Sequence, residues 1–305
     1  MSGSVDAYTG TTKDLLVNRK LPQFTGFSSV TANLGKLQNK GLEVMLNANC
    51  LKNENFEWSV NGIFSMNRRK ILTLYGDMEN ILDDAGNIIG QKEVDDPNNN
   101  WFIGQDPDRI WSWKRVGVWQ LNEETEALRY GFRVGDFKFK DQNDDGVLDV
   151  KDNVFQGYRT PRSRISLRND FTIYKNFTVS LSMYSYLGYY GNFVAAGNQN
   201  GGNPYRYSYW DMPHWTKDNP SNDYARIGGS YLGNNWVSRS FVRFDNLAVS
   251  YNVPKSALQK LSVQNLRLTL AVRNLAMWAP HWTFWDPETQ GLSPRYFNVG
   301  INISL

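Results

Sequence analysis

The stretch DQNDDGVLDVKD, residues 141–152, has the spacing of a calcium-binding loop. Side-chain oxygens stand at its first, third, fifth, ninth and twelfth positions, on Asp141, Asn143, Asp145, Asp149 and Asp152. Calcium takes six to eight oxygen ligands, so the backbone carbonyl of Val147 would be a further donor, and Gly146 permits the sharp turn of such a loop. The pattern predicts a structural Ca²⁺ site.

Two features of this stretch keep an alternative open. The twelfth position is Asp rather than the usual Glu, so a shorter arm has to reach the metal. The flanking residues alternate like strands and lack the helical period of an EF-hand. An Asp-rich turn that binds no metal is the alternative. With calcium, the predicted role is to order a long loop, and no catalysis follows.

Four tryptophans fall in long segments between regular elements: Trp210, Trp215, Trp282 and Trp285. An aromatic face in an exposed loop can stack on a sugar ring or dock a partner protein. The same side chains can instead pack the loops against one another, because long loops need small cores of their own. Both interpretations stay open at this point.

Paired carboxylates raise the question of a glycosidase, which needs two carboxyls in a cleft, one with a raised pKa. The pairs available are Asp83/Asp84, Asp95/Asp96 and Asp286/Glu288. Nothing in the sequence marks a cleft around them, so solvated loop acids are the preferred interpretation. The histidines, His214 and His281, both lie in PHWT and are interpreted as loop anchors. No enzyme is predicted.

Composition excludes several classes of protein. The 33 basic and 30 acidic residues give a net charge of +3, too small to indicate nucleic-acid binding. The single cysteine, Cys50, excludes an internal disulfide framework and a multi-cysteine zinc site. No apolar run is long enough for a transmembrane helix, and no signal peptide is visible at the N-terminus. These absences carry little weight for a fragment, and they do not bear on a β-barrel, whose alternating strands give a weaker hydropathy signal.

Alternation of apolar and polar residues is the dominant pattern, which predicts an all-β chain. The alternating runs lie at 42–50, 56–64, 165–173, 177–183, 266–272 and 297–305. In FVRFDNLAVSY the apolar row changes phase, which predicts a β-bulge at Asp245–Asn246 and leaves Arg243 out of any core. Helical periodicity is visible only, and weakly, in residues 255–261.

The connections between these runs are unequal. Turns 52–55 and 174–176 have four residues or fewer, whereas 74–108 and 191–235 run to dozens of residues. Counted back from a periplasmic C-terminus, 52–55, 174–176 and 253–264 would lie inside, and 74–161, 191–235 and 279–292 outside. Strands of about 9–11 residues with tight turns at one end and long loops at the other are typical of outer-membrane barrels. Segments 109–120 and 132–140 carry Lys114 and Arg115 on opposite faces. One of these two cations would have to face lipid, at a cost of about 2–4 kcal/mol near the midplane, so we place both segments outside the membrane.

Several stretches resemble the SusC/RagA-type TonB-dependent transporters of Bacteroidota. Residues 14–47 contain the family's N-x-G-x-x-x-N-K-G-hydrophobic-E core at Asn33, Gly35, Asn39, Lys40, Gly41 and Glu43. Further similar segments are GDFKFKDQNDDGVLDVKD (135–152), HWTKDNPSNDYAR (214–226), SFVRFDNLAVSYNVP (240–254), LRLTLAVRNLAMW (266–278) and the C-terminal WDPETQGLSPRYFNVGINISL. The chain departs from the family at Leu305, where Phe or Trp is usual.

The resemblance implies a 22-stranded antiparallel transmembrane barrel with a plug domain inside, of which residues 1–305 are a C-terminal segment. Because this segment holds neither plug nor leader, the resemblance implies either a fragment or one piece of a split transporter. It also implies TonB-dependent uptake of oligosaccharide or peptide across the outer membrane, with a SusD-like lipoprotein as partner. Leu266, Leu268, Leu270 and Val272 would then face lipid, and Arg267, Thr269 and Arg273 the lumen. A secreted soluble β-domain that binds carbohydrate is the alternative.

Overall fold

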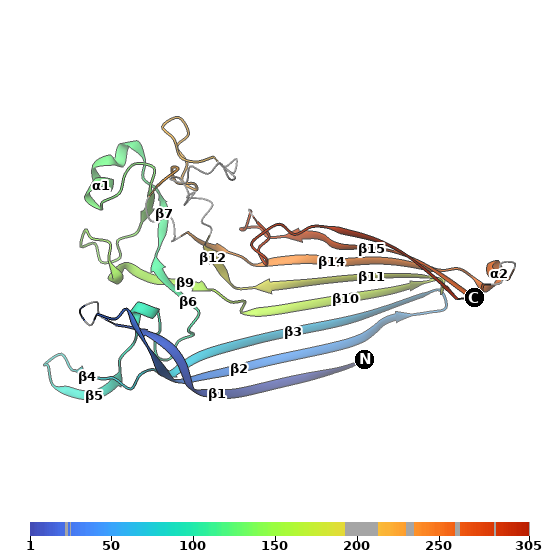
Figure 1. Cartoon of the computed structure of the whole chain (residues 1–305), viewed down its shortest axis with the longest axis horizontal. Helices are drawn as coiled ribbons and strands as arrows, with labels where there is room; N and C mark the ends of the chain where they lie inside the picture. The colour runs from blue at the N-terminus through green and yellow to red at the C-terminus, as the bar shows by residue number, and fades with distance from the viewer. Residues whose placement is uncertain are drawn as a thin grey trace.

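Eight long strands form one antiparallel sheet, in which most neighbours in space are also neighbours in sequence (Figure 1). The structure, a computed structural model, describes residues 1–305 apart from 22, 23, 25, 193–212, 230–234, 260–262, 284 and 305. The order is β1 (Ser2–Lys20), β2 (Ser29–Lys52), β3 (Phe56–Thr73), β10 (Ser163–Ile173), β11 (Phe177–Leu187), β14 (Phe241–Asn252), β15 (Asn265–Trp278) and β16 (Tyr296–Ser304). The all-β prediction is confirmed.

The register brings apolar positions opposite one another. Leu270 on β15 lies between Val249 on β14 and Val299 on β16. Val249 in turn faces Val179 on β11, which faces Phe171 on β10. Since side chains alternate between faces with a period of two, these pairings align into rows on one face of the sheet.

That apolar face is left uncovered. Val299 is 80% exposed, Ile301 65% and Leu270 53%. A soluble sheet buries such a face against another layer, whereas the wall of a transmembrane barrel turns it to lipid. In the part of the chain that is described, no helix is long and apolar enough to cross a membrane.

The predicted β-bulge is present. Phe244 and Asn246 have partners on both neighbouring strands, and Asp245 between them has none on either. Of the two α-helices that the structure describes, α2 (Lys255–Leu258) lies within the weakly helical stretch 255–261, whose last residues are outside the described chain. The other, α1 (Glu124–Arg129), was not predicted, because six residues are too few to show a helical period.

The two ends of the sheet differ, as predicted. Short turns and α2 lie at the right-hand end in Figure 1, with both chain termini on that side, and the long connections gather at the left. There the segments form two-stranded sheets: β4 (Met78–Leu82) with β5 (Ile88–Glu93), β6 (Arg109–Trp113) with β9 (Asn153–Tyr158), β7 (Arg115–Val118) with β8 (Phe137–Phe139), and β12 (Tyr190–Asn192) with β13 (Trp236–Ser238). Segments 109–120 and 132–140 are therefore outside the main sheet.

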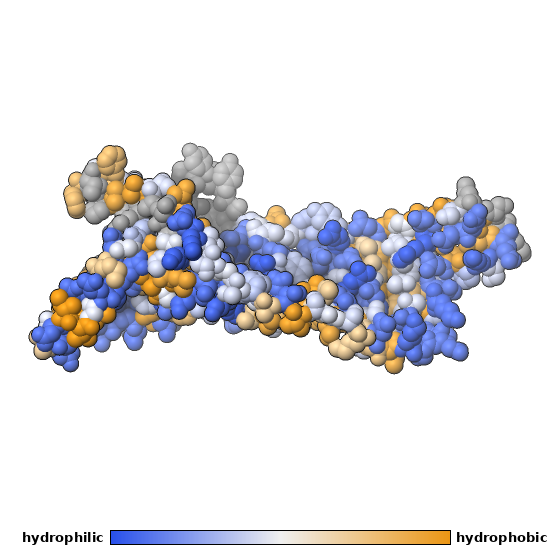
Figure 2. Space-filling view, turned by 90° about the horizontal axis from the view of Figure 1, so that it is seen from below, coloured by the Kyte–Doolittle hydropathy of each residue, from blue (hydrophilic) through white to orange (hydrophobic). Residues whose placement is uncertain are grey.

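The principal apolar core lies in this loop region. It joins three parts of the chain that are distant in sequence, and its buried members are Val118, Trp119, Ala127, Phe132, Phe137, Phe139, Trp215, Ala225 and Trp282. A smaller core around Ile71 and Leu74 covers the loop end of β3. Apolar residues also remain exposed on β4–β5, at the left-hand tip in Figure 2. The loops thus form a folded body above the sheet.

Candidate functional site

The face of the sheet opposite the apolar rows is polar. Ser250 on β14 and Thr269 on β15 have their hydroxyl oxygens 3.0 Å apart. On β10, Asp170 accepts hydrogen bonds from Arg168 and from Ser180 of β11. In a barrel this face lines the lumen, so a ligand that passes through meets hydroxyls, amides and charges.

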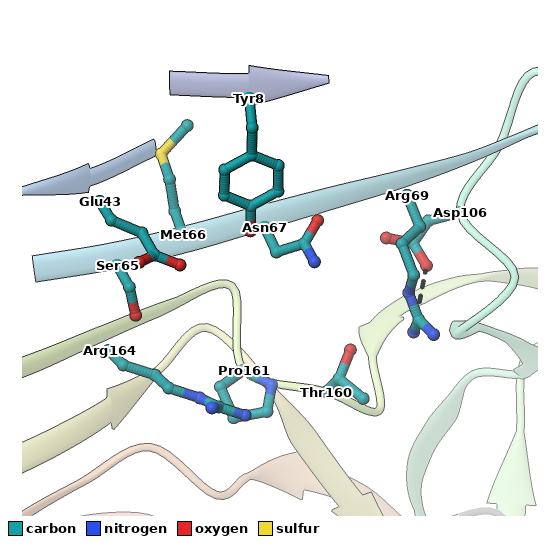
Figure 3. A pocket seen from close by; sticks show the side chains of 10 residues that line it. All are labelled: Tyr8, Glu43, Ser65, Met66, Asn67, Arg69, Asp106, Thr160, Pro161 and Arg164. Atoms are coloured by element: carbon teal, nitrogen blue, oxygen red, sulfur yellow. Dashed lines mark ion pairs between the residues drawn. The ribbon is translucent and has the colours of Figure 1, made fainter. Parts of the chain in front are cut away.

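A pocket of about 300 Å³ lies on this polar face, near the loop end of the sheet (Figure 3). Its lining comes from two adjacent rows of the sheet. In the first row Glu43 lies opposite Ser65, which lies opposite Arg164. In the second row Tyr8 lies opposite Gly41, which lies opposite Asn67. Four neighbouring strands therefore build this site.

Ion pairs hold one rim of the pocket. Asp106 is only 6% exposed and lies 3.8 Å from Arg69 and 2.5 Å from Arg162. Arg69 also pairs with Asp108. Because these charges satisfy one another, the segment around Asp106 is fixed against the end of β3 and the start of β10.

A buried ion pair fastens the loop 279–292 to the sheet. The guanidinium of Arg243 on β14 donates to both carboxylate oxygens of Asp286, at 2.8 and 2.6 Å. Burial raises the pKa of Asp286, but hydrogen bonds from Arg243 and Ser293 outweigh it and hold the pKa below its usual range. Arg243 is 4% exposed, so the expectation that it lies outside any buried region is wrong, as is the expectation that Asp286 is a solvated acid.

The predicted calcium loop is a network of hydrogen bonds in this structure. Asp141 accepts from the backbone amide of Gly146 at 2.8 Å, and Asp145 accepts from the amide of Val147 at 3.0 Å. The side-chain amide of Asn143 donates to Asp145 at 2.8 Å. These bonds bring the first half of the loop into one tight turn.

The second half of the loop closes on Asp152. This residue is fully buried and accepts from the amides of Gln142 and Asp149, at 2.7 and 2.8 Å. Asp149 accepts from the amide of Lys151, and its own carbonyl accepts from the indole of Trp113 at 2.6 Å. The loop is therefore tied to β6 as well as to itself.

One oxygen in the loop is left over. Asp141 is 8% exposed, and its Oδ1 is buried without a hydrogen-bond partner. Burial raises the pKa of Asp141, but bonds from Gly146 and from the hydroxyl of Tyr130 outweigh it, so the pKa lies below the usual range. An ionised carboxylate with one oxygen unsatisfied is a donor that fits a hard cation. Within the described chain, however, no three His, Cys, Asp or Glu side chains converge as a metal cluster.

The tryptophans divide into three cases. Trp215 and Trp282 are buried in the loop core, at 8% and 6% exposure, and the indole of Trp215 donates to Gln120 at 2.8 Å. The packing interpretation therefore describes these two. Trp285 is half-buried and lines a pocket beside Arg243. Trp210 lies outside the described residues.

Two arrangements were not found from the sequence: the pocket around Tyr8 and the buried pair of Arg243 with Asp286. Alternation does assign Glu43 and Arg164 to the polar face of their strands. Which residues stand side by side depends on the register between strands, and a single sequence does not give that register across a long connection.

The order of strands, the polar and apolar faces and the folded loops can be compared with known proteins. No protein-family model matches the chain. The chain is 29% identical over 330 residues to TonB-dependent receptor P26 of Formosa agariphila. This alignment covers 98% of the chain and 32% of that receptor. It is 24% identical over 264 residues to TonB-dependent receptor SusC of Bacteroides thetaiotaomicron, over 83% of the chain and 24% of SusC.

A solved structure shows the same fold. The RagAB peptide transporter superposes with a TM-score of 0.70 over 99% of this chain and 33% of its own, at 19% identity. The chain is a homologue of SusC/RagA-type TonB-dependent receptors. Its eight-stranded sheet is a segment of a barrel of that kind, and it spans about a quarter to a third of the length of the curated relatives just named.

Proposed function

We propose that the chain is the C-terminal barrel segment of an outer-membrane importer that takes up oligosaccharides or peptides. The observation that carries this proposal is the sheet with two unlike faces. One face exposes Leu270 and Val299 as lipid requires, and the other presents hydroxyls and charges as a lumen requires. The homology to TonB-dependent receptors supports energised import. The uncovered apolar face argues against a soluble carbohydrate-binding domain.

Two partners belong to this proposal. Energy would arrive from a TonB complex through a plug domain in the lumen, where the polar face would meet it. A SusD-like surface lipoprotein would sit on the loop end, where the loop core gives a firm platform. The chain itself contributes wall and loops, and we assign it no catalytic step.

Uptake by cells tests the proposal. The gene that encodes the chain is deleted, and import of fluorescent oligosaccharides and peptides is compared with the parent strain, with and without a protonophore. We expect uptake of one class to need both the gene and the proton gradient. Undiminished uptake in the deletion strain, or recovery of the full-length protein without detergent, would contradict the proposal.

We also propose that the loop 141–152 binds one structural Ca²⁺. Asp141, Asn143, Asp145, Asp149 and Asp152, with the carbonyl of Val147, would hold the ion; when bound, it would supply the charge that brings the carboxylates together. The partnerless Oδ1 of Asp141 supports this donor set. The loop contacts Trp113 of β6 and Tyr130, the residue after α1, and leads directly into β9. The ion would therefore order the loop body and take no part in transport.

Terbium, which replaces calcium in oxygen sites, provides a direct readout, because Trp113 touches the loop and can transfer excitation to the ion. We expect terbium luminescence on excitation of tryptophan, quenched by calcium and absent in Asp145→Ala. In the same variant, and after chelation, new protease cuts should arise in the loop region 135–159. Equal luminescence in wild type and variant would mean an Asp-rich turn without a specific metal.

A further inference from the structure

The pocket around Tyr8 has a feature that the import proposal does not require: an aromatic ring seated on a glycine. A Cβ added to Gly41 would lie 2.1 Å from Cζ of Tyr8 and 2.5 Å from its Cε1. The phenol end of the ring therefore lies against the bare backbone of β2. Tyr8 is nonetheless 43% exposed, so part of the ring remains open to the pocket.

Charged side chains of both signs stand beside this ring. Glu43 is two residues from Gly41 on the same face, and Arg164 lies two strands away, about 10 Å between Cα atoms from the usual strand spacing. Among the described residues, the side chains of Glu43 and Arg164 make no hydrogen bond or ion pair, and the guanidinium of Arg164 lies 5.0 Å from the centre of the Tyr186 ring. Both charged groups are free to bind a ligand.

These features select a class of ligand. A sugar hydroxyl both donates and accepts, so one ring can satisfy the carboxylate of Glu43 and the guanidinium of Arg164. The balanced charges favour a neutral molecule over a polyanion or a polycation. The exposed ring of Tyr8 offers an apolar surface on which the C–H face of a pyranose can lie.

Recognition of a peptide by its backbone is disfavoured at this place. Peptides that add to a sheet pair with the free edge of a strand. Here β2 is already paired with β1 on one side and with β3 on the other. Only side chains face the pocket, so a peptide would find no ladder of amides and carbonyls to join.

We propose that this pocket is a lumenal subsite for one pyranose unit of a neutral oligosaccharide, with Tyr8 as platform, Glu43 and Arg164 as hydroxyl ligands and Gly41 as the seat of the ring. A volume of about 300 Å³ is at the lower end for small-ligand sites and suits a single unit of a longer chain. The inference rests on the proposed import function and narrows its cargo.

Calorimetry on the full-length protein, purified in a sugar-free detergent, tests the subsite. The probes are maltohexaose, cellohexaose, mannohexaose and, as the peptide, tetra-alanine. We expect one hexasaccharide to bind, Tyr8→Ala to weaken it about tenfold, and Gly41→Ala to do the same by displacing the ring. Tyr8→Phe, which keeps the ring, should stay within about twofold of wild type.

Two controls separate the subsite from a general effect on the sheet. Tyr296 is an exposed tyrosine on the same face at the opposite edge, and Gly10 on β1 has open space where a Cβ would be placed. Tyr296→Ala and Gly10→Ala should bind the saccharide like wild type. The subsite is overturned if no hexasaccharide binds, or if Tyr8→Ala and Tyr296→Ala have the same affinity for it. It is also overturned if Tyr8→Ala weakens the binding of tetra-alanine and leaves the binding of the hexasaccharide unchanged. Gene-dependent uptake that Tyr8→Ala leaves unchanged would overturn the subsite and leave import standing.

Discussion

The two faces of β15 can be tested with one substitution at two adjacent positions, Leu270→Arg and Thr269→Arg. Leu270 lies between Val249 and Val299 in the apolar rows, whereas Thr269 touches Ser250 on the polar face. Arg267 and Arg273, in phase with Thr269, show that the polar face of this strand already accepts guanidinium groups.

The magnitude follows from the position of Leu270 along the strand. It is five residues from Asn265, at the turn end of a 14-residue strand. At about 3.3 Å per residue and a tilt of about 40°, it lies about 13 Å up an apolar band about 25 Å tall, close to the midplane. An arginine there costs about 2–4 kcal/mol, whereas on the lumen face the cost is near zero. Every 1.4 kcal/mol is about a tenfold change in an equilibrium constant.

The assay measures folded full-length protein in the outer membrane by surface labelling and by the shift of the unheated band in gel electrophoresis. We expect Thr269→Arg to assemble like wild type and Leu270→Arg to be strongly depleted from the folded band. Equal folded amounts of the two variants, or depletion of Thr269→Arg alone, would refute the assignment of faces.

Further predictions concern the loops and the sheet. Asp286→Asn takes from buried Arg243 its bidentate carboxylate and leaves only Glu288, at 3.5 Å, so it should cost up to about 3–5 kcal/mol and open 285–293 to protease. Glu288→Gln loses only that longer pair and keeps an oxygen that can accept from Tyr184, so it should open the segment much less. Because the pKa of Asp286 is lowered in the folded state, its contribution to stability is complete above the ordinary pKa near 4 and is lost as the pH falls through the lowered value. Cleavage of the wild-type protein in 285–293 should therefore begin only below about pH 4. Cleavage already at about pH 5 would contradict the ion pair. Gly35→Ala puts a Cβ 2.7 Å from the carbonyl oxygen of Leu74 and should lower the folded yield, while Gly10→Ala should not.

Much of the sheet could be predicted because lipid imposes a simple rule on it. Every second residue of a spanning strand must be apolar, so rows such as Leu266 to Val272 are visible in the sequence, and a phase change reveals the bulge at Asp245. The spacing of 141–152 likewise predicts a tight loop by itself, because its contacts are local.

What could not be predicted depends on contacts between distant segments. Arg243 was expected outside a core because its own strand gives no sign that Asp286 folds back over it. The pairing of Tyr8 with Gly41 depends on the register across the connection between β1 and β2, which alternation leaves undetermined. The burial of Trp215 and Trp282 depends on a core assembled from three loops. In each case the decisive neighbour is far away in the chain.

The pairing of β3 with β10 has an evolutionary consequence. These strands are adjacent in the sheet although residues 74–162 lie between them, and they meet in the same direct ladder as strands joined by a tight turn. The entropic cost of closing a connection rises by only about 0.6 kcal/mol for each doubling of its length. By this entropic term alone, the pairing of β3 with β10 depends little on the length of the inserted segment. A surface module of another length could therefore stand between β3 and β10 without redesign of the strands that cross the membrane, provided that it pairs with Arg69 and Arg162 as Asp106 does.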